Sequence, residues 1–327
     1  MANTSGRAGS LQAATQVKQV DSHTYTADFD AAWTIGQVPH GGYVASVFQR
    51  VVEAHFGTTL AKQNQPHTMI FHLEYVRRTE VGPATFKVRD VKLGRQTSTV
   101  HITLSQKDRE EVLGYVTNTN ILNETGVSYP TLWRPIPPRP SVDLQKLDSD
   151  SDAIWGERKV WPVSWFRKAP THARFFFPRA GQPDPSVSDQ WMCLRNGENW
   201  TNESLGYVAD SFPQIIEVYA TKEIDPYSIA VQERMDIKEQ EAKYKNPGFW
   251  FPTLVLNLDV KKALPATGVK WLFVRLQAKQ IKNGRYDLEM IIMDETEQIV
   301  ALSHHVCLAV SAARNTAKRR TAEQTKL

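Results

Sequence analysis

The tetrapeptide Gly42-Tyr43-Val44-Ala45 occurs a second time in this chain, as Gly206-Tyr207-Val208-Ala209. The likeness continues beyond it, since Phe48 is matched by Phe212 at the same offset of 164 residues. After the first copy, apolar residues recur at the spacing of one helix face. The repeat therefore predicts two similar helices, each entered through a glycine, over Gly42–Phe56 and Gly206–Tyr219.

Two later pairs of blocks keep the same order along the chain. They are Phe71–Arg78 with Leu256–Lys262, at an offset of 185 residues (His72 to Asn257), and Val112-Leu113 with Ile299-Val300, at an offset of 187. An offset that increases once and then holds indicates a duplicated fold with one insertion in the second copy. We assign the insertion to the charged, helix-favouring stretch Val231–Lys245 and expect a helical excursion near the cleft.

Runs of alternating apolar and polar residues accompany each helix and are typical of antiparallel strands. The predicted strands are Thr24–Phe29, Met69–Val76, Ala84–Lys92, Gln96–Gln106 and Glu111–Ile121 in the first copy, and Trp191–Arg195, Leu254–Val260, Val269–Ile281, Tyr286–Met293 and Ile299–Ala309 in the second. A central helix wrapped by an antiparallel meander, used twice, is an α+β fold of the double hotdog type. Sheets of this kind have free edges, so we also expect a homo-oligomer.

The repeat and the composition along the chain predict five segments. We expect a disordered N-terminus over residues 1–20, an N-terminal hotdog over 21–125, a proline- and aromatic-rich irregular linker over 126–188, a C-terminal hotdog over 189–312 with the insertion near 222–249, and a basic polar tail over 313–327. Five prolines between Tyr129 and Pro140 exclude a central strand or a helix interior there.

Composition excludes several classes of protein. The net charge of +4 is mild, and much of it falls near the polar C-terminal end, so we expect no nucleic-acid partner. The two cysteines, Cys193 and Cys307, exclude a disulfide framework and a cysteine-based zinc cluster, and we expect no metal and no cofactor. No apolar run reaches membrane-spanning length and no signal-peptide core is present, which favours the cytoplasm. The ending Thr325-Lys326-Leu327 is one residue away from the Ser-Lys-Leu peroxisomal address.

The residues around the two helix entries resemble a known family. Trp33 followed by Pro39-His40-Gly41-Gly42-Tyr43-Val44-Ala45, and later Gly206-Tyr207-Val208-Ala209-Asp210-Ser211, are similar to the two helix entries of the double-hotdog acyl-CoA thioesterases, the acyl-CoA thioesterase II or thioesterase-like group. The resemblance covers roughly residues 22–125 and 190–312. It implies hydrolysis of an acyl thioester of coenzyme A or of an acyl carrier protein.

The resemblance also implies a catalytic set. In the family an aspartate, a Thr or Ser from a strand and a Gln near the end of the last strand orient the attacking water. Asp210 matches the aspartate, the strand position falls on Asn257, and the Gln position falls on His305 with His304 as an equal rival. The substrate-binding residues we expect are His40, Gly41, Gly42 and Tyr43.

Elementary chemistry is consistent with these roles. The amides at a helix N-terminus can hold a thioester oxyanion, which assigns that task to Gly42. A histidine can transfer a proton at neutral pH, and Asn257 can hold a water. Under the repeat Ser46 corresponds to Asp210, His72 to Asn257 and Asn118 to His305. Because one copy alone carries the carboxylate, we expect one working site and one that is degenerate or binds substrate.

Two other functions fit the same residues. A hotdog dehydratase or another acid–base enzyme on a polyketide-like substrate would use His40 with Asp210, and Asp210-Ser211-Phe212-Pro213-Gln214 has the Asp-x-x-x-Gln form of double-hotdog dehydratases. A non-catalytic acyl-binding protein is the third reading.

Overall fold

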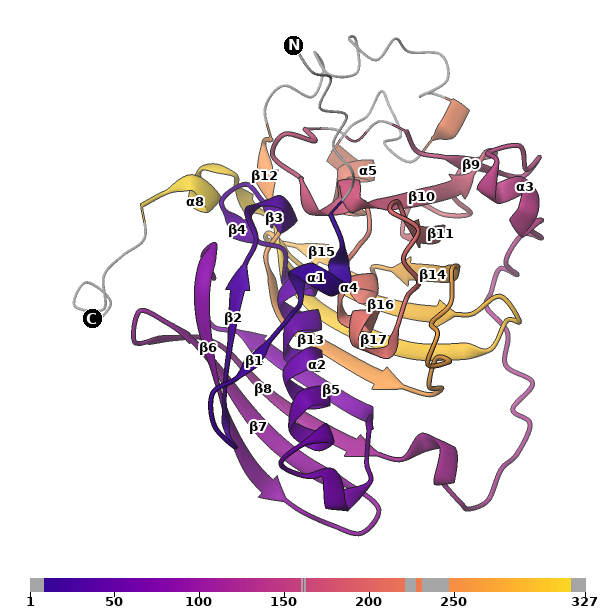
Figure 1. Ribbon diagram of the computed structural model, residues 1–327. Helices are drawn as coiled ribbons and strands as arrows, with labels where there is room; N and C mark the ends of the chain where they lie inside the picture. Colours follow the sequence, from indigo (N-terminus) through magenta and orange to yellow (C-terminus); the bar gives the residue numbers. More distant parts are fainter. Residues whose placement is uncertain (1–8, 160, 162, 221–227, 231–246, 319–327) are drawn as a thin grey trace, which may run out of the picture.

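A large curved antiparallel sheet runs through the molecule and wraps around α2, and two small sheets, β3-β4 and β12-β18, accompany it (Figure 1). The computed structural model describes residues 9–159, 161, 163–220, 228–230 and 247–318. The large sheet has 14 strands, in the order β1-β2-β6-β7-β8-β5-β13-β17-β16-β14-β11-β10-β9, with β15 paired to β16. The predicted α+β double hotdog is therefore confirmed, with the sheets of the two copies joined into one.

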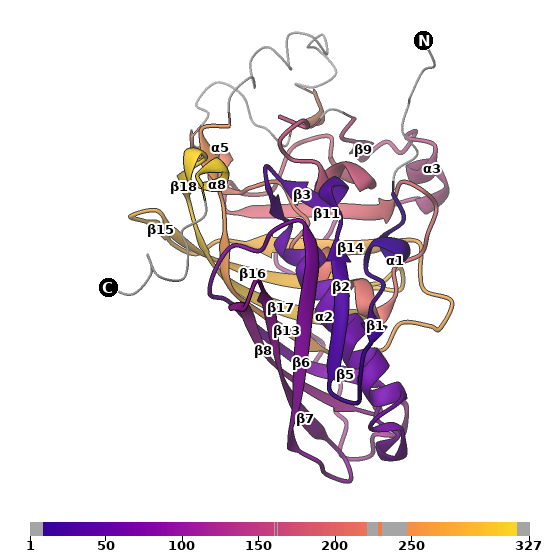
Figure 2. The ribbon, with the colours of Figure 1, turned by 60° about the vertical axis from the view of Figure 1, so that its left-hand side comes forward.

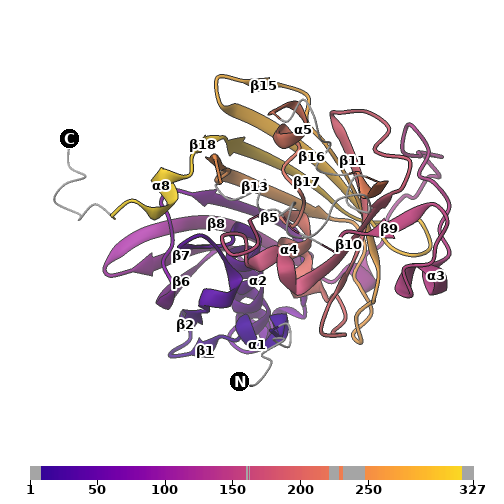
Figure 3. The ribbon, with the colours of Figure 1, turned by 90° about the horizontal axis from the view of Figure 1, so that it is seen from above.

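The strand order of one half mirrors that of the other. The first copy contributes β2 (Thr24–Phe29), β6 (Gly82–Lys92), β7 (Ser98–Gln106), β8 (Arg109–Thr119) and β5 (His67–Tyr75). The second contributes β13 (Thr253–Val260), β17 (Ile299–Leu308), β16 (Arg285–Met293), β14 (Leu272–Gln277) and β11 (Val187–Leu194). The halves meet where β5 pairs with β13, and Figure 3 shows the purple β5 beside the orange β13.

The register of the pairing confirms the duplication. His72 lies directly opposite Asn257, the residue to which it corresponds, so a pseudo-twofold axis passes between them. Both central strands carry a bulge at the equivalent point, between Thr68 and Ile70 in β5 and between Thr253 and Val255 in β13. The structural offset between β8 and β17 is 189 residues rather than 187, because Tyr75 pairs with Val112 where Val260 pairs with Ala301.

The first predicted helix is confirmed, whereas the second is broken. Helix α2 (Gly41–Gly57) lies along the concave face of the first copy's strands (Figure 2). In the second copy α4 (Leu205–Ala209) ends at Asp210, and α5 (Ile216–Ala220) starts afresh. Pro213 explains the interruption, because proline disfavours helical backbone at the preceding residue and cannot donate a helix hydrogen bond.

The helices approach each other so closely that only glycine fits between them. A Cβ atom on Gly42 would lie 2.8 Å from the carbonyl oxygen of Gly206, and one on Gly206 would lie 2.7 Å from the Cβ of Ala45. The gap is bridged by hydrogen bonds from the Gly206 amide to Gln49 Oε1 (2.7 Å) and from the Tyr207 amide to Ser46 Oγ (3.0 Å). The repeated Gly-Tyr-Val-Ala is thus the crossing point of the two helices.

Several segments differ from expectation. The region expected to be irregular contributes α3 (Leu144–Asp148), β9 (Trp155–Glu157) and β10 (Ala173–Pro178). All eight residues of β11 are buried, because this segment covers the outer face of the sheet with a second apolar cluster that includes Leu147, Trp155 and Trp191.

The described part of the N-terminus is also ordered. It forms α1 (Leu11–Ala14) and β1 (Lys18–Gln19), with Leu11 buried and its amide donating to Glu198. The predicted insertion Val231–Lys245 lies entirely outside the described residues. No helix in the described ranges is long and apolar enough to cross a membrane.

The remaining elements are short. They are η1 (Ala31–Trp33), β3 (Thr34–Ile35), β4 (Val38–Pro39), η2 (Ala61–Gln63), η3 (Ile121–Asn123), η4 (Ala169–His172), η5 (Asn202–Ser204), β12 (Phe249–Trp250), β15 (Ile281–Lys282), β18 (Val310–Ser311) and α8 (Ala313–Thr316). Several of them surround the cavity described next.

Candidate functional site

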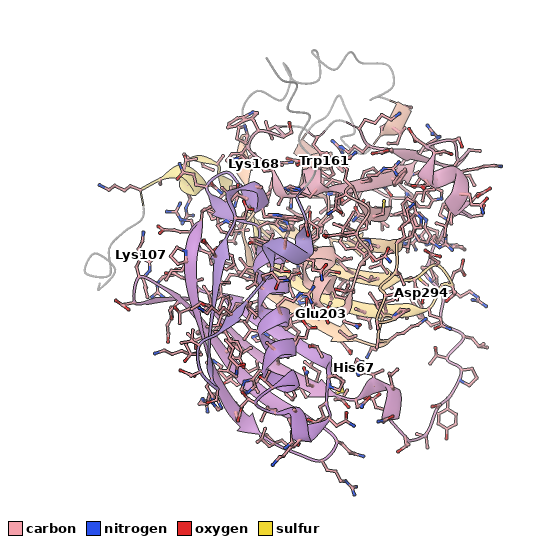
Figure 4. The ribbon with its side chains drawn as sticks, viewed as in Figure 1. His67, Lys107, Trp161, Lys168, Glu203 and Asp294 are labelled. Carbon is pink, nitrogen blue, oxygen red and sulfur yellow. The ribbon has the colours of Figure 1, made fainter. Side chains whose placement is uncertain are left out.

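A cavity of about 650 Å³ opens at the N-terminal end of α2. Its floor carries His40, Gly41, Asp210 and Thr253, and aromatic side chains that include Phe212 form part of its walls. Trp161, which also lines it, lies at the end of the molecule that carries β3, β4 and β12 (Figure 4). Six cations are among the cavity's lining residues, Arg77, Arg78, Arg109, Arg167, Arg314 and Lys318, of which Arg109 and Arg167 form ion pairs with Glu111 and Glu217.

Asp210 is held at the point where α4 stops. It is 7% exposed, and its Oδ2 accepts a hydrogen bond of 2.7 Å from the amide of Gly42. The glycines of α2 make this approach possible, because a Cβ on Gly41 would lie 2.7 Å from the same Oδ2 and one on Gly42 would lie 2.7 Å from the Cβ of Asp210. The break in the second helix therefore positions the carboxylate against the start of the first.

Three further side chains surround this carboxylate. Thr253 donates its hydroxyl to Oδ1 at 3.1 Å. His305 Nδ1 lies 3.7 Å from Oδ1, and His40 Nε2 lies 3.6 Å from Oδ2. Both histidine distances exceed a direct hydrogen bond. Among the described residues, neither ring nitrogen of His305 has a hydrogen-bond partner, and Nδ1 of His40 has none.

Burial sets the charge of the two histidines. His305 is fully buried, which lowers its pKa to about 4, although the charge of Asp210 acts in the opposite direction. Burial lowers the pKa of His40 as well, again against the pull of Asp210. Both imidazoles are therefore neutral near pH 7. A neutral imidazole offers one donor and one acceptor nitrogen, so each ring can orient a water or exchange a proton.

Tyr75 and Cys307 complete the surroundings without adding charge. Tyr75 donates its hydroxyl to the carbonyl of Gly41 at 2.7 Å, and burial raises the pKa of this phenol well above its usual value. Burial likewise raises the pKa of the Cys307 thiol, whose sulfur lies 3.8 Å from the Thr253 hydroxyl. The carboxylate of Asp210 is thus surrounded by neutral groups.

The structure does not bring Asn257 to this site. Its side chain lies on the outer face of the sheet, where Oδ1 contacts His72 Nδ1 at 2.7 Å and Nδ2 donates to the carbonyl of His304. Asn257 is four residues along β13 from Thr253, which corresponds to about 13 Å. Side chains also alternate between the two faces of β17, which separates the two candidate histidines. His304 is exposed on the outer face, and His305 is buried beside Asp210.

Thr253 is the residue that sequence reasoning missed. In a regular strand Thr253 and Asn257 would share one face, and the buried residues Leu256 and Leu258 would occupy the other. The bulge between Thr253 and Val255 shifts this alternation and turns Thr253 toward Asp210. Thr253 is a Thr on the expected strand, so the residue type was visible in the sequence but the bulge was not.

The expected substrate-binding residues separate into two groups. His40 and Gly41 line the cavity. The amide of Gly42 is occupied by Asp210, which removes it as the oxyanion donor we expected. Tyr43 belongs to the core: it is fully buried, stacks on Trp33 and donates its hydroxyl to the carbonyl of Ala14 at 2.8 Å.

A smaller cavity lies at the related position, beside η5 at the start of α4. Its volume is about 330 Å³, and it is lined by Ser204 and Arg50, which correspond to His40 and Gln214 of the larger cavity at the offset of 164 residues. Ser46, the counterpart of Asp210, accepts the Tyr207 amide. The corrected register places Val116, rather than Asn118, opposite His305 in the repeat. The two positions that correspond to Asp210 and His305 in the repeat, Ser46 and Val116, therefore carry neither a carboxylate nor a histidine.

Comparison with known proteins gives two family matches and one close relative. The family model for the acyl-CoA thioesterase N-terminal domain matches residues 29–119, and the one for the C-terminal domain matches residues 139–309. The thioesterase-like protein TwmA of Talaromyces wortmannii is 38% identical over 345 residues, which cover 96% of this chain and 97% of that protein.

Solved structures share the fold at low sequence identity. A conserved protein of unknown function with a hot dog fold from Alicyclobacillus acidocaldarius superposes with a TM-score of 0.64 at 13% identity, covering 92% of this chain and 98% of that one. The acyl-CoA thioesterase II TesB2 of Mycobacterium marinum gives 0.57 at 14% identity, covering 93% and 100%. At this level of identity the likeness establishes the architecture alone.

Proposed function

The chain belongs to the acyl-CoA thioesterase family, and we propose that it hydrolyses an acyl thioester at the cavity built around Asp210. The observation that carries the proposal is the meeting of Asp210, Thr253 and His305 at one point. The resemblance implied an aspartate, a Thr or Ser and a Gln. With Thr253 in place of Asn257, the set departs from that pattern only at His305.

The attacking water would sit beside Oδ1 of Asp210. Thr253 orients this oxygen, and His305 Nδ1, 3.7 Å away and otherwise unpartnered, has room to share a water with it. The water oxygen attacks the thioester carbonyl carbon while Asp210 takes its proton as general base. His305 holds the water by a hydrogen bond, the role that the Gln side chain has in the family pattern.

The carbonyl oxygen of the substrate needs a donor as it becomes an oxyanion. Since Gly42 already donates to Asp210, we assign this role to the amide of Gly41, the first of α2, at the positive end of the helix dipole. Collapse of the tetrahedral intermediate breaks the carbon–sulfur bond. The proton held by Asp210 passes to the thiolate, so that one water is consumed and one carboxylic acid and one thiol are released.

The basic residues that line the cavity support a phosphorylated thiol carrier. Arg77, on the connection after β5, and Arg314, in α8, line it together with four other cations. Guanidinium groups bind phosphate oxygens through charge-assisted hydrogen bonds. We infer that coenzyme A, with its diphosphate and ribose phosphate, or the phosphopantetheine arm of a carrier protein enters from this side.

The test is thiol release from a panel of acyl-CoA esters. Asp210→Asn should lower kcat by about 10²–10⁴-fold, the usual contribution of a general base. Ser46→Ala is the matched control, because it alters the pseudo-equivalent residue and should leave kcat nearly unchanged. Full turnover by Asp210→Asn would rule out the proposed base. Acyl ligand binding without any thiol release by the unaltered protein would favour a non-catalytic acyl-binding role.

One contact keeps the dehydratase alternative open. His40 and Asp210 face each other from opposite helices at 3.6 Å, each with 8% of its side chain exposed, as an acid–base pair would. A lyase would use His40 as its base, whereas the hydrolysis described above does not. Loss of activity in His40→Ala, with substrate dehydration and no released thiol in the unaltered protein, would establish the lyase instead.

A further inference from the structure

Three potential metal ligands meet at the opposite end of α2 from the cavity. His23 precedes β2, His55 lies in the last turn of α2, and Asp90 lies on β6. His23 Nε2 is 3.3 Å from Asp90 Oδ2, and His55 Nε2 is 3.0 Å from Asp90 Oδ1. One ligand atom of each residue lies within 4.8 Å of the others. Tetrahedral zinc, with bonds of about 2.0–2.2 Å, needs ligand atoms roughly 3.4 Å apart.

A further hydrogen bond to each imidazole orients its ring so that Nε2 faces the carboxylate of Asp90. His23 Nδ1 is 2.8 Å from Ser22 Oγ, and His55 Nδ1 is 3.1 Å from the Tyr25 hydroxyl. Each ring therefore has its Nδ1 engaged by a hydroxyl and its Nε2 directed at the carboxylate. Outer hydrogen bonds of this kind fix the tautomer and orientation of metal-bound histidines.

We propose that His23, His55 and Asp90 form a binding site for a divalent transition-metal ion, with zinc as the ion that fits best. Two imidazoles and one carboxylate are a common zinc donor set, and water would fill the open position. Each neutral imidazole keeps its single proton, which moves from Nε2 to Nδ1 and is donated to Ser22 or Tyr25, whose hydroxyls can accept as well as donate.

The position of the cluster points to a structural role. His55 follows Gly41 by 14 residues, which is about 21 Å along a helix with a rise of 1.5 Å per residue. A metal ion here would tie the end of α2 to the connection before β2 and to β6, far from Asp210. The expectation of no metal rested on the two cysteines, whereas these three ligands are widely separated in the chain and form no spaced motif.

Calorimetric titration of ZnCl₂ into untagged, EDTA-treated full-length protein tests the site, with thermal unfolding measured in parallel. We expect one ion per chain and a higher Tm with zinc. His23→Ala and Asp90→Asn should each weaken binding by at least about tenfold, the scale on which even outer-shell changes act. Both side chains are partly exposed, so these variants should fold, whereas fully buried His55 is a poor choice.

The matched control is His101→Ala, a partly buried histidine on β7 that is not part of the cluster. It should bind zinc as the unaltered protein does. Absence of saturable binding, or equal binding by His23→Ala, would overturn the proposal. Because the site is remote from Asp210, EDTA should leave thiol release unchanged; loss of turnover with the metal would contradict the structural role while leaving Asp210 to be tested separately.

Discussion

At the scale of single residues, His305 is the most informative departure from the family pattern. A Gln can only orient a water, whereas an imidazole can also gain a proton. Its surroundings decide between these possibilities, since complete burial lowers the pKa of His305 to about 4. The ring therefore stays neutral under ordinary conditions and acts as a hydrogen-bonding group. We expect His305→Gln to retain thioesterase activity within about tenfold.

The same burial makes stability depend on pH. The pKa of His305 falls from 6.5 in the unfolded chain to about 4 in the folded one, so between these values the unfolded state binds more protons. The contribution of the neutral His305 ring to the free energy of unfolding is fully retained above pH 6.5. It is lost as the pH falls toward 4, by up to about 3 kcal/mol. Urea unfolding measured at pH 7.5 and at pH 4.5 should show a smaller loss in the free energy of unfolding for His305→Gln than for the unaltered protein. An identical loss in both proteins would contradict the assignment.

At the scale of elements, the contact between α2 and α4 determines the site. Gly42 allows the backbones to meet, and the end of α4 at Asp210 places the carboxylate on the amide of Gly42. A continuous second helix, as the periodicity predicted, would have carried residue 210 within a helical turn. Because the proline three residues later interrupts the helix, Asp210 can accept the Gly42 amide and so connect the two copies.

Gly42→Ala tests this element directly. The added methyl would lie 2.7–2.9 Å from atoms of Asp210, Gly206 and Tyr207, two of them in the backbone, so it cannot be accommodated by side-chain rotation. We expect a loss of about 1–3 kcal/mol in the free energy of unfolding together with impaired turnover. Gly57→Ala, at the end of the same helix with nothing within 4 Å, should be neutral or stabilising by up to about 1 kcal/mol. Equal effects in the two variants would refute close packing at Gly42.

At the scale of the whole molecule, the two pseudo-equivalent positions in the described part of the chain carry cavities of different size. The larger takes residues from both copies and from α8, and gathers six cations among its lining residues. In the repeat, Ser46 and Val116 stand at the positions that correspond to Asp210 and His305. Asymmetry between two copies of one fold is what the sequence predicted from the unpaired carboxylate.

An experiment can separate the contribution of the basic residues to substrate binding from the contribution of the reacting centre to turnover. The double variant Arg77→Gln/Arg314→Gln should raise KM for an acyl-CoA by about tenfold, or about 1.4 kcal/mol, with little change in kcat. The matching N-acetylcysteamine thioester, which lacks phosphates, should show no such increase. Lys62→Gln, an exposed cation outside the cavity, is the control variant. An equal increase in KM for both thioesters would mean that the arginines do not bind phosphate.

The sequence by itself determined the duplication, the double hotdog plan and the first helix to within a residue at each end. It could do so because periodicity, glycine placement and block order are local or repeated signals. It also identified Asp210 and His305, which the structure places side by side. Asp210 stands in the repeated helix entry, which can be read without knowing the pairing of the strands, whereas His305 followed from the resemblance to the family.

Only the tertiary structure decided the rest. Thr253 rather than Asn257 reaches Asp210 because a bulge, set by pairing between strands, reverses the alternation of β13. Gly42 is withdrawn from oxyanion binding because a side chain 168 residues away in sequence accepts its amide hydrogen. The choice between His304 and His305 depended on which face of β17 is covered. Each of these outcomes arises from contacts between distant segments, and such contacts leave no periodic signal in the chain.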